Sequence, residues 1–448
     1  EADKQVISGS PITRDITGEE FYSTIYAIRE STLEKGLIWV GANDGPVHVT
    51  RDGGQHWQRV DPKGLPGGGR VDAVEPSPHQ AAKAYISVLR YQLGDWQPYI
   101  FKTTDFGKSW KRITKGIPAD YPVRVVREDP DREGLLYAGT EYGLFVSFDD
   151  GNQWQPFQQN LPVTPVTDLK VHRKDLVLST MGRGFWILDD LSALHQSFDK
   201  MNASEAMLFK PRDTYRYRYS TFGGIAGLPG PEYPRPSVIV DYYLPDKTND
   251  PLQLEIFNGE NELIRTLIST PDSAQKKSEA YRNMATNKIT YSVNENLENK
   301  KGHHRFLWDM RHTGAWDKSD NRRYQSGPVV STGEYTFKLK VDGKILEQSC
   351  QLLLDPRVAE SGVTLSDLKK QETVSLQIIS LLSEARKLAD NTEKEIKKWK
   401  DKTGMTEEEK ARLNKLKTLK NKLVNANGAY PQNMFISQVS YFNSPCRF

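Results

Sequence analysis

Three copies of one short motif recur in the first part of this 448-residue chain, and they restrict its fold more than any other feature. The motif reads Ser/Thr-x-Asp-x-Gly-x-x-Trp, and its copies end at Trp57, Trp110 and Trp154. Their spacing is roughly 45 to 55 residues, the length of one four-stranded propeller blade. Three matches at such intervals predict a β-propeller in this region.

The residue types of the motif suit a tight turn between two strands. The aspartate can accept hydrogen bonds from nearby backbone N–H groups, while the glycine tolerates a positive φ. The hydroxyl group adds a second local bond, and the tryptophan is expected to pack beneath its own turn. We therefore interpret six residues as structural: Asp52, Trp57, Asp105, Trp110, Asp149 and Trp154.

The apolar runs around these motifs predict the rest of each blade. Runs at 71–74, 123–126 and 166–169 are expected to form the innermost strands of successive blades. A fourth unit continues to Asp190 but lacks the motif. Closed rings have about four to eight blades, so three such blades and one further unit are too few for a ring of the usual size. We expect the remaining blades to come from sequence upstream of Glu1 or from another chain.

The later parts of the chain predict two other architectures. We assign residues 1–200 to the propeller, 201–357 to an immunoglobulin- or fibronectin-like β-sandwich, and 358–448 to an α-helical region. Thr406 and Glu409 form a capping-box pattern that starts the second helix of a predicted hairpin. A dimerising coiled coil is the alternative for these helices. The predicted fold class is mainly β: an incomplete propeller, a sandwich and a C-terminal helical hairpin.

The motifs also resemble a known family. Together with the runs at 139–147 (GTEYGLFVS) and 182–190 (GRGFWILDD), they are similar to bacterial sortilin-like proteins with Asp-box (BNR) repeats, which are often labelled glycosyl hydrolases. The resemblance implies that this chain is the C-terminal part of a protein of about twice its length. It also implies a secreted or cell-envelope, extracytoplasmic location in a bacterium.

A ligand site is expected on the propeller face opposite the Asp-box motifs. Because successive strands of a blade alternate in direction, the turns between second and third strands emerge on that face. These turns carry the five residues that we predict to bind a ligand: Asn43, Asp44, Glu141, Tyr142 and Arg183. The alternative interpretation is that Asn-Asp-Gly and Glu-Tyr-Gly are simply good hairpin turns.

The sequence favours binding over catalysis. A glycoside hydrolase needs two carboxylates on either side of the sugar, and Asp44 with Glu141 is the only pair that we nominate. A sialidase needs an arginine cluster for the substrate carboxylate, and Arg183 alone does not supply one. We predict an interaction module for a protein, peptide or glycan in a larger assembly, with a glycoside hydrolase acting on a polysaccharide as the alternative.

The composition excludes several classes of partner. A net charge of +3, from 61 basic and 58 acidic residues, gives no basis for nucleic-acid binding. No stretch approaches the length of an apolar membrane span, and neither a phosphate loop nor a dinucleotide fingerprint occurs. We expect no cofactor and no metal, and interpret His303, His304 and His312 as surface residues. The two cysteines, Cys350 and Cys446, could form one bridge or stay separate.

Overall fold

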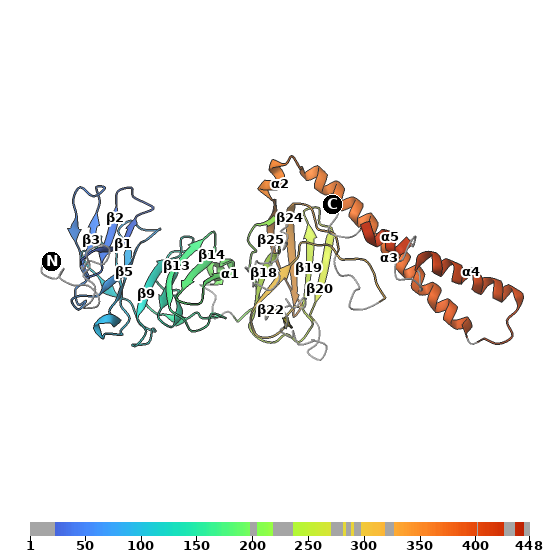
Figure 1. Cartoon of the computed structure of the whole chain (residues 1–448), viewed down its shortest axis with the longest axis horizontal. Coiled ribbons are helices and arrows are strands. Elements are labelled where there is room, and N and C mark those ends of the chain that lie inside the picture. Colours follow the sequence, from blue (N-terminus) through green and yellow to red (C-terminus); the bar gives the residue numbers. More distant parts are fainter. Residues whose placement is uncertain are drawn as a thin grey trace, which may run out of the picture. The chain divides into compact units, whose positions relative to one another are not determined.

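The computed structural model describes residues 23–197, 204–217, 236–269, 281–283, 288–290, 297–318, 327–400, 402–424 and 435–442. Its internal contacts divide the chain into two compact units, Glu1–Lys200 and Met201–Phe448. The first unit contains the strands coloured blue to green in Figure 1, and the second contains those coloured green to orange and all the long helices. Each unit is described below by itself.

The first unit consists of successive antiparallel sheets in which spatial order follows sequence order. Blade 1 comprises β1 (Ile25–Glu30), β2 (Ile38–Ala42), β3 (Val47–Thr50) and β4 (Gln58–Arg59). Blade 2 comprises β5 (Arg70–Pro76), β6 (Ala84–Leu89), β7 (Ile100–Thr103) and β8 (Lys111–Arg112). Blade 3 comprises β9 (Val123–Glu128), β10 (Leu136–Thr140), β11 (Gly143–Ser147) and β12 (Gln155–Pro156). The fourth unit comprises β13 (Val166–His172), β14 (Asp175–Thr180) and β15 (Phe185–Leu188), followed by α1 (Ser192–Ser197).

These sheets are the propeller blades that the motif spacing predicts, and they pack face to face. Alternate side chains of a strand point to opposite faces of its sheet. We call the face toward the preceding blade the leading face and the opposite one the trailing face. Trp39 and Val49 on the trailing face of blade 1 pack in one core with Val74, Ile86 and Phe101 on the leading face of blade 2.

The same packing repeats at the next interface. Tyr85 and Ile100 of blade 2 form one core with Val126, Ala138 and Phe145 of blade 3. Inner strands β5 and β9 have buried residues on both faces, which explains why they read as largely apolar runs rather than as an alternating pattern. The predicted innermost strands therefore coincide with β5, β9 and β13.

The Asp-box turns, at residues 50–57, 103–110 and 147–154, connect the third and fourth strands of blades 1 to 3. In the second turn, Asp105 Oδ1 accepts hydrogen bonds from the Thr103 hydroxyl at 2.8 Å and from Ser109 N at 2.9 Å. Thr103 Oγ1 accepts one from Gly107 N at 2.9 Å. The other two turns repeat this pattern, so the local interactions explain the choice of residues at the aspartate and hydroxyl positions.

The tryptophans of the second and third turns differ from the expectation that each would pack beneath its own turn. Trp110 Nε1 donates a hydrogen bond to Val60 O, and Trp154 Nε1 donates one to Ile113 O, both at 2.7 Å. Each acceptor directly follows the last strand of the preceding blade. The indole therefore joins neighbouring blades, because its long ring reaches past the turn to a backbone carbonyl of the preceding blade.

The second unit contains a two-layer sandwich. One sheet has the order β16 (Met207–Leu208), β18 (Val238–Leu244) and β23 (Gly302–Trp308). The other has the order β17 (Thr214–Arg216), β25 (Lys344–Leu354), β24 (Gly333–Val341), β19 (Gln253–Asn258) and β20 (Leu263–Ile268). Both sheets contribute to one core, around Trp308, Tyr242 and Phe337. A separate hairpin pairs β21 (Tyr281–Asn283) with β22 (Lys288–Thr290).

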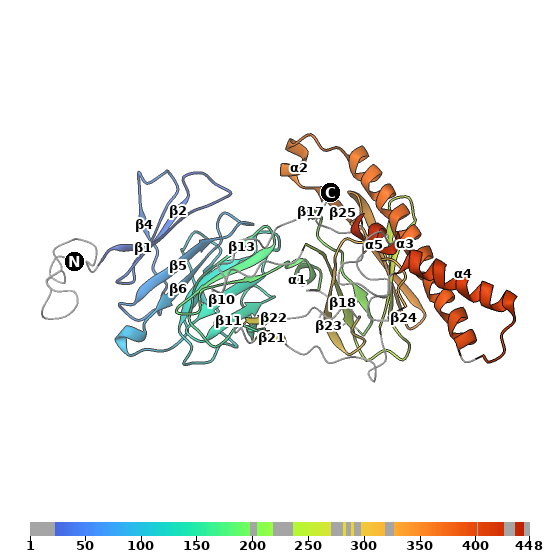
Figure 2. The ribbon, with the colours of Figure 1, turned by 45° about the vertical axis from the view of Figure 1, so that its right-hand side comes forward.

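The C-terminal part is helical, as predicted. It comprises α2 (Pro356–Glu360), α3 (Leu365–Lys400), α4 (Glu407–Leu423) and α5 (Phe435–Phe442). The capping box of Thr406 and Glu409 is present at the start of α4, which lies alongside α3 (Figure 2). None of the described helices combines the length and apolar character that crossing a membrane requires. Cys350 is buried without a disulfide, and Cys446 lies outside the described residues.

Candidate functional site

The four innermost strands of the first unit share one irregularity. In each of them the pairing with the second strand skips a single residue near the start, which leaves Tyr26, Asp72, Arg124 and Thr167 bulged. A β-bulge turns a side chain away from its regular direction. Innermost strands begin at the end of the propeller where second-to-third strand turns also emerge. The bulges therefore place three polar groups and a tyrosine on the face where the sequence predicts a ligand site.

Two ion pairs occupy this face. Arg70 donates to both carboxylate oxygens of Asp72, and Arg124 Nε lies 2.6 Å from Glu141 Oε1. We call Arg70, Asp72, Arg124 and Glu141 the mouth cluster. Burial raises the pKa of Asp72, against the opposing effect of Arg70. Glu141 raises the pKa of Asp72 further, so the two pairs interact electrostatically.

Aromatic rings surround the mouth cluster. The Arg70 guanidinium lies 4.3 Å from the centre of the Tyr26 ring, and that of Arg124 lies 5.8 Å from the Tyr91 ring. Two ring pairs flank these contacts, Tyr91 with Trp96 at 5.7 Å and Tyr121 with Tyr142 at 4.6 Å. Tyr26, Trp96 and Tyr142 are exposed. The face thus combines buried charges with accessible aromatic surface, as recognition surfaces in proteins commonly do.

A buried arginine holds the loops beside the cluster in place. Arg90 Nη1 donates to the carbonyl oxygens of Pro66, Gly67 and Gly68, and its Nε donates to Asp95 at 2.9 Å. A methyl group at Gly69, where φ is +101°, would lie 2.6 Å from Cγ of Arg90. The run of three glycines therefore lets the backbone approach this side chain closely.

The structure separates the five predicted ligand residues. Glu141 and Tyr142 belong to the mouth cluster and its aromatic surround, as described above. Asn43 Oδ1 accepts a hydrogen bond from Thr24 N at 3.0 Å, so its amide ties the turn between β2 and β3 to the residue before β1. Asp44 accepts one from Ser23 at 2.7 Å and lines a hollow of about 780 Å³ on blade 1. Arg183 lies exposed in the turn of the fourth unit.

The nominated hydrolase pair is not brought together in the described part of the chain. Asp44 borders the hollow on blade 1, whereas the carboxylate neighbour of Glu141 is Asp72. Arg70, Asp72 and Arg124 were not predicted. The available signal was a charged residue at the second position of two otherwise apolar runs, VDAV at 71–74 and VRVV at 123–126.

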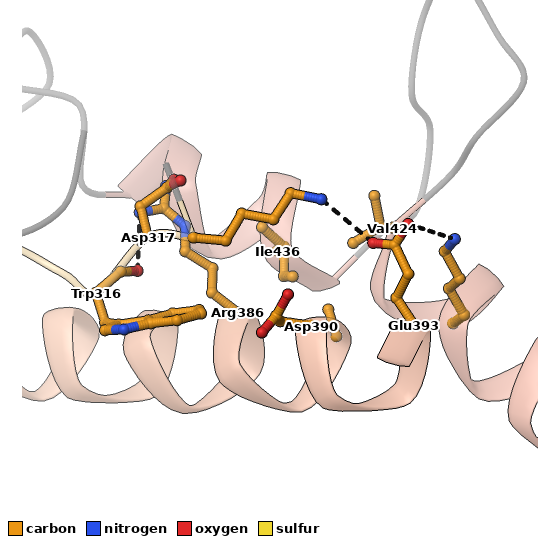
Figure 3. A pocket seen from close by; sticks show the side chains of 10 residues that line it. Trp316, Asp317, Arg386, Asp390, Glu393, Val424 and Ile436 are labelled. Carbon is orange, nitrogen blue, oxygen red and sulfur yellow. Dashed lines mark hydrogen bonds and ion pairs between the residues drawn. The ribbon is translucent and has the colours of Figure 1, made fainter. Parts of the chain in front are cut away.

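A second, smaller hollow of about 260 Å³ lies in the other unit, between α3, α4, α5 and the segment 316–318. Figure 3 shows Asp390 and Glu393 projecting from α3 beside Arg386 and Trp316. Glu393 is paired with Lys318 at 3.2 Å and with Lys420 at 3.6 Å. The acidic and basic groups of this hollow therefore offset each other, and they select no particular ligand charge.

One group of side chains has the composition of a metal site, namely Asp129, Asp131 and His195. The buried Asp129 carboxylate already accepts hydrogen bonds from the backbone N–H groups of Asp131 and Arg132. It also contacts Tyr137 Oη at 3.0 Å and His195 Nε2 at 2.8 Å. The arrangement serves as a hydrogen-bond junction that ties α1 to blade 3.

Besides Asp72, inner strand β5 carries a second carboxyl group with a raised pKa. Burial raises the pKa of Glu75 to about 7, although Arg127, whose Nη1 lies 3.4 Å away, opposes the shift. Between pH 4.5 and 7 the folded chain retains a proton that the unfolded chain releases, so the free energy of unfolding should fall as pH rises through this window. Above about pH 7 the effect should be constant.

Glu75→Gln should remove this dependence. Between pH 4.5 and pH 8 the wild type should lose roughly 2–3 kcal/mol of unfolding free energy relative to the variant. Denaturant titrations at a series of pH values would measure it, with Glu34→Gln in an exposed loop as the control. Parallel pH profiles for Glu75→Gln and wild type would contradict the prediction.

The similarities of this chain to known proteins are confined to solved structures of low sequence identity. No protein-family model and no curated protein matches the sequence. Among solved structures, the chain is similar to YCF48 bound to D1 peptide, with 20% identity, a TM-score of 0.29 and coverage of 37% of this chain and 51% of that one. It is also similar to the GH74 xyloglucanase from Xanthomonas campestris, with 12% identity, a TM-score of 0.30 and coverage of 70% and 50%.

A third similar structure is the extracellular domain of a putative hybrid two-component system from B. thetaiotaomicron. Here the identity is 12%, the TM-score 0.30 and the coverage 72% of this chain and 47% of that one. The chain thus spans about half the length of these structures. The sheets and their order define the class: a mainly β protein with a propeller unit and a helical C-terminal part.

Proposed function

We propose that this chain is a non-catalytic binding module of the cell envelope or extracellular space, and that it holds a peptide segment of a partner protein at the mouth cluster. The observation that carries the proposal is the state of Arg124. Its side chain is about nine-tenths buried, and its Nε faces Glu141. No acceptor in the described part of the chain takes a hydrogen bond from its two terminal nitrogens. They remain available for a ligand carboxylate or carbonyl oxygen.

The surroundings of Arg124 favour a peptide. Trp96, which contacts Tyr91, and Tyr142, which follows Glu141, are both exposed. Leu93 adds an exposed apolar side chain in the same loop as Trp96. Large aromatic residues beside a buried arginine are typical of the few positions that dominate protein–protein affinity. A peptide with an acidic group next to an apolar side chain would match both features.

Hydrolysis is supported by one observation. Asp72, whose pKa is raised by burial, interacts with Glu141, and glycosidases use a protonated acid together with a second carboxylate. However, each of these carboxylates is already paired with an arginine, Asp72 with Arg70 and Glu141 with Arg124. An arginine partner favours the charged form of a carboxylate and occupies its oxygens. Binding is therefore the better-supported function.

The remaining parts of the chain fit a docking role in this proposal. The predicted sandwich at 201–357 and helical region at 358–448 would attach the module to a larger assembly. Within the second unit, the helices are fixed to the sandwich through contacts such as His312 Nε2 to Glu372 Oε1 at 2.5 Å and Trp316 N to Ser383 Oγ at 3.0 Å. The sandwich and the helices of the second unit are thus held together by these hydrogen bonds.

The test is a binding screen of the full chain on immobilised peptides in which acidic and aromatic residues are varied. Trp96→Ala and Tyr142→Ala should each weaken binding of the selected peptide at least tenfold, which corresponds to a loss of at least about 1.4 kcal/mol. Tyr215→Ala, an equally exposed tyrosine in the second unit, is the matched control and should leave affinity unchanged.

Two outcomes would contradict the proposal. One is a peptide whose affinity is insensitive to Trp96 and Tyr142, because it would place recognition elsewhere. The other is release of reducing sugars from a polysaccharide that is abolished in Asp72→Asn or Glu141→Gln, because it would establish the hydrolase. Glycan arrays incubated with the wild type and the same variants would test for this hydrolysis.

A further inference from the structure

The leading face of blade 1 carries the side chains of a blade interface, but no blade built from the described residues packs against it. The strand register makes the positions comparable. Ile28 pairs with Val40 in blade 1, just as Val74 pairs with Ile86 in blade 2 and Val126 with Ala138 in blade 3. These positions in blades 2 and 3 are buried in the interface with the preceding blade.

In blade 1 the inner-strand side chains of this row are exposed, although Val40 beside them is buried. Ile28 is 61% exposed, and Ile25, which corresponds to the fully buried Val71 and Val123, is 64% exposed. The hollow of about 780 Å³ described above lies on this face and is lined by Ile25, Val40, His48 and Trp57 among others. His48 stands where blades 2 and 3 have Phe101 and Phe145, so the apolar character is strongest along the inner strands.

The first Asp-box turn gives independent evidence for a missing neighbour. Trp110 and Trp154 bind a carbonyl of the preceding blade, whereas Trp57 is 44% exposed and donates no hydrogen bond to any described residue. The glycines of these turns also contact the preceding blade in the later turn but not in the first. A methyl group at Gly107 would lie 2.7 Å from Val60 of the preceding blade, but one at Gly54 would meet only Trp57 of its own turn.

The fourth unit ends in the complementary surface. Its trailing face exposes Phe185 (82%) and Ile187 (59%) on β15. By register these residues correspond to Leu144 and Val146 of blade 3, which are buried against the fourth unit. The first unit therefore has an open leading face at one end and an open trailing face at the other.

We propose that a second copy of this chain covers these faces head to tail, with the trailing face of the fourth unit of one copy packed on the leading face of blade 1 of the other. The contact would continue the interface that already joins the blades within each copy. Two copies would supply eight units, which lies within the about four to eight blades of closed propellers. The proposal concerns a surface separate from the mouth cluster and does not rest on the proposed function.

The head-to-tail arrangement permits a complementation experiment on the full chain. Ile28→Asp disables the leading face and Phe185→Asp disables the trailing face, at positions whose exposure makes both changes compatible with folding. The wild type should sediment as a dimer at about 1–100 µM. Each variant alone should be a monomer, because every contact needs one face of each kind.

An equimolar mixture of the two variants should form a 1:1 dimer, since Ile28→Asp keeps its trailing face and Phe185→Asp keeps its leading face. Leu263→Asp, exposed on β20 of the second unit, is the control and should dimerise like the wild type. A wild-type monomer throughout this concentration range would overturn the proposal and would leave blades of other sequence as the occupant. So would dimers that persist in either single variant, because the contact would then lie elsewhere.

Discussion

Replacing Lys83 by methionine is expected to lower the free energy of unfolding of the propeller unit by about 3–5 kcal/mol. Lys83 lies just before β6 in blade 2, and its Nζ is 2.8 Å from Oε1 of Glu128 at the end of β9 in blade 3. Both side chains are buried. Burial alone would lower the pKa of Lys83, but the hydrogen bond and charge of Glu128 outweigh it and leave the pKa above its ordinary value.

Methionine retains the length of the lysine side chain, so the expected loss comes from the carboxylate that remains. Glu128 would keep the hydrogen bond from Gly134 N but would lose its buried cation. The double variant Lys83→Met/Glu128→Met should recover most of the stability, because a buried ion pair is often no better than an apolar pair of similar volume.

Glu133→Ala is the matched control for the same cation. Glu133 also binds Lys83, at 3.0 Å, but it is about half exposed, and we expect its replacement to cost less than about 1 kcal/mol. Denaturant unfolding of the full chain, followed by near-UV circular dichroism, would measure all three variants. A loss of unfolding free energy below about 1 kcal/mol for Lys83→Met would contradict the prediction. It would show that water or a local rearrangement of the protein stabilises the unpaired Glu128 carboxylate.

The propeller could be predicted because its signals are local. In each Asp-box turn the aspartate, hydroxyl and glycine bond to one another within five residues, so the motif determines the turn without help from distant sequence. The apolar runs then determine the inner strands. The capping box of α4 was predicted for the same reason, since Thr406 and Glu409 satisfy each other's backbone groups.

The mouth cluster could not be predicted because it depends on pairing between distant residues. Asp72 and Arg124 reach the mouth only through bulges, and a bulge depends on how one strand registers with the next. Of the predicted ligand residues, Glu141 joins the cluster and Tyr142 belongs to its aromatic surround, because their turn adjoins the bulge of the same blade. Asn43 instead ties the turn between β2 and β3 to the residue before β1.

The role of the turn tryptophans was misjudged for a related reason. The sequence motif covers a single repeat, so it predicts only contacts within that repeat. Trp110 and Trp154 instead donate hydrogen bonds to a carbonyl of the preceding blade. Strand β17 of the second unit likewise has no local sequence signal. It is three residues long and pairs in parallel with β25, far along the chain, so no local pattern marks it.

The glycines of the Asp-box turns should behave unequally toward alanine, although the motif makes them equivalent. Gly107→Ala is expected to destabilise the propeller unit by about 2–4 kcal/mol. Its φ is +82°, and the new methyl group would lie 2.7 Å from Cβ and 2.8 Å from Cγ2 of Val60. Gly151→Ala should cost a similar amount, because its φ is +81° and its methyl group would collide with Ile113.

Gly54→Ala is the matched control within the same motif. Its φ of +95° imposes comparable backbone strain, but the methyl group would meet only Trp57, at 3.7 Å, so we expect a loss of about 1 kcal/mol. The difference between Gly107→Ala and Gly54→Ala therefore isolates the contact with the preceding blade from the strain of the turn. Equal losses at the two positions, measured by denaturant unfolding of the monomeric Phe185→Asp chain, would mean that the turn alone explains the glycine.

In the proposed head-to-tail dimer, Gly54 would contact the fourth unit of the other copy. Gly54→Ala should therefore weaken dimerisation of the otherwise wild-type chain even though it costs the single copy little.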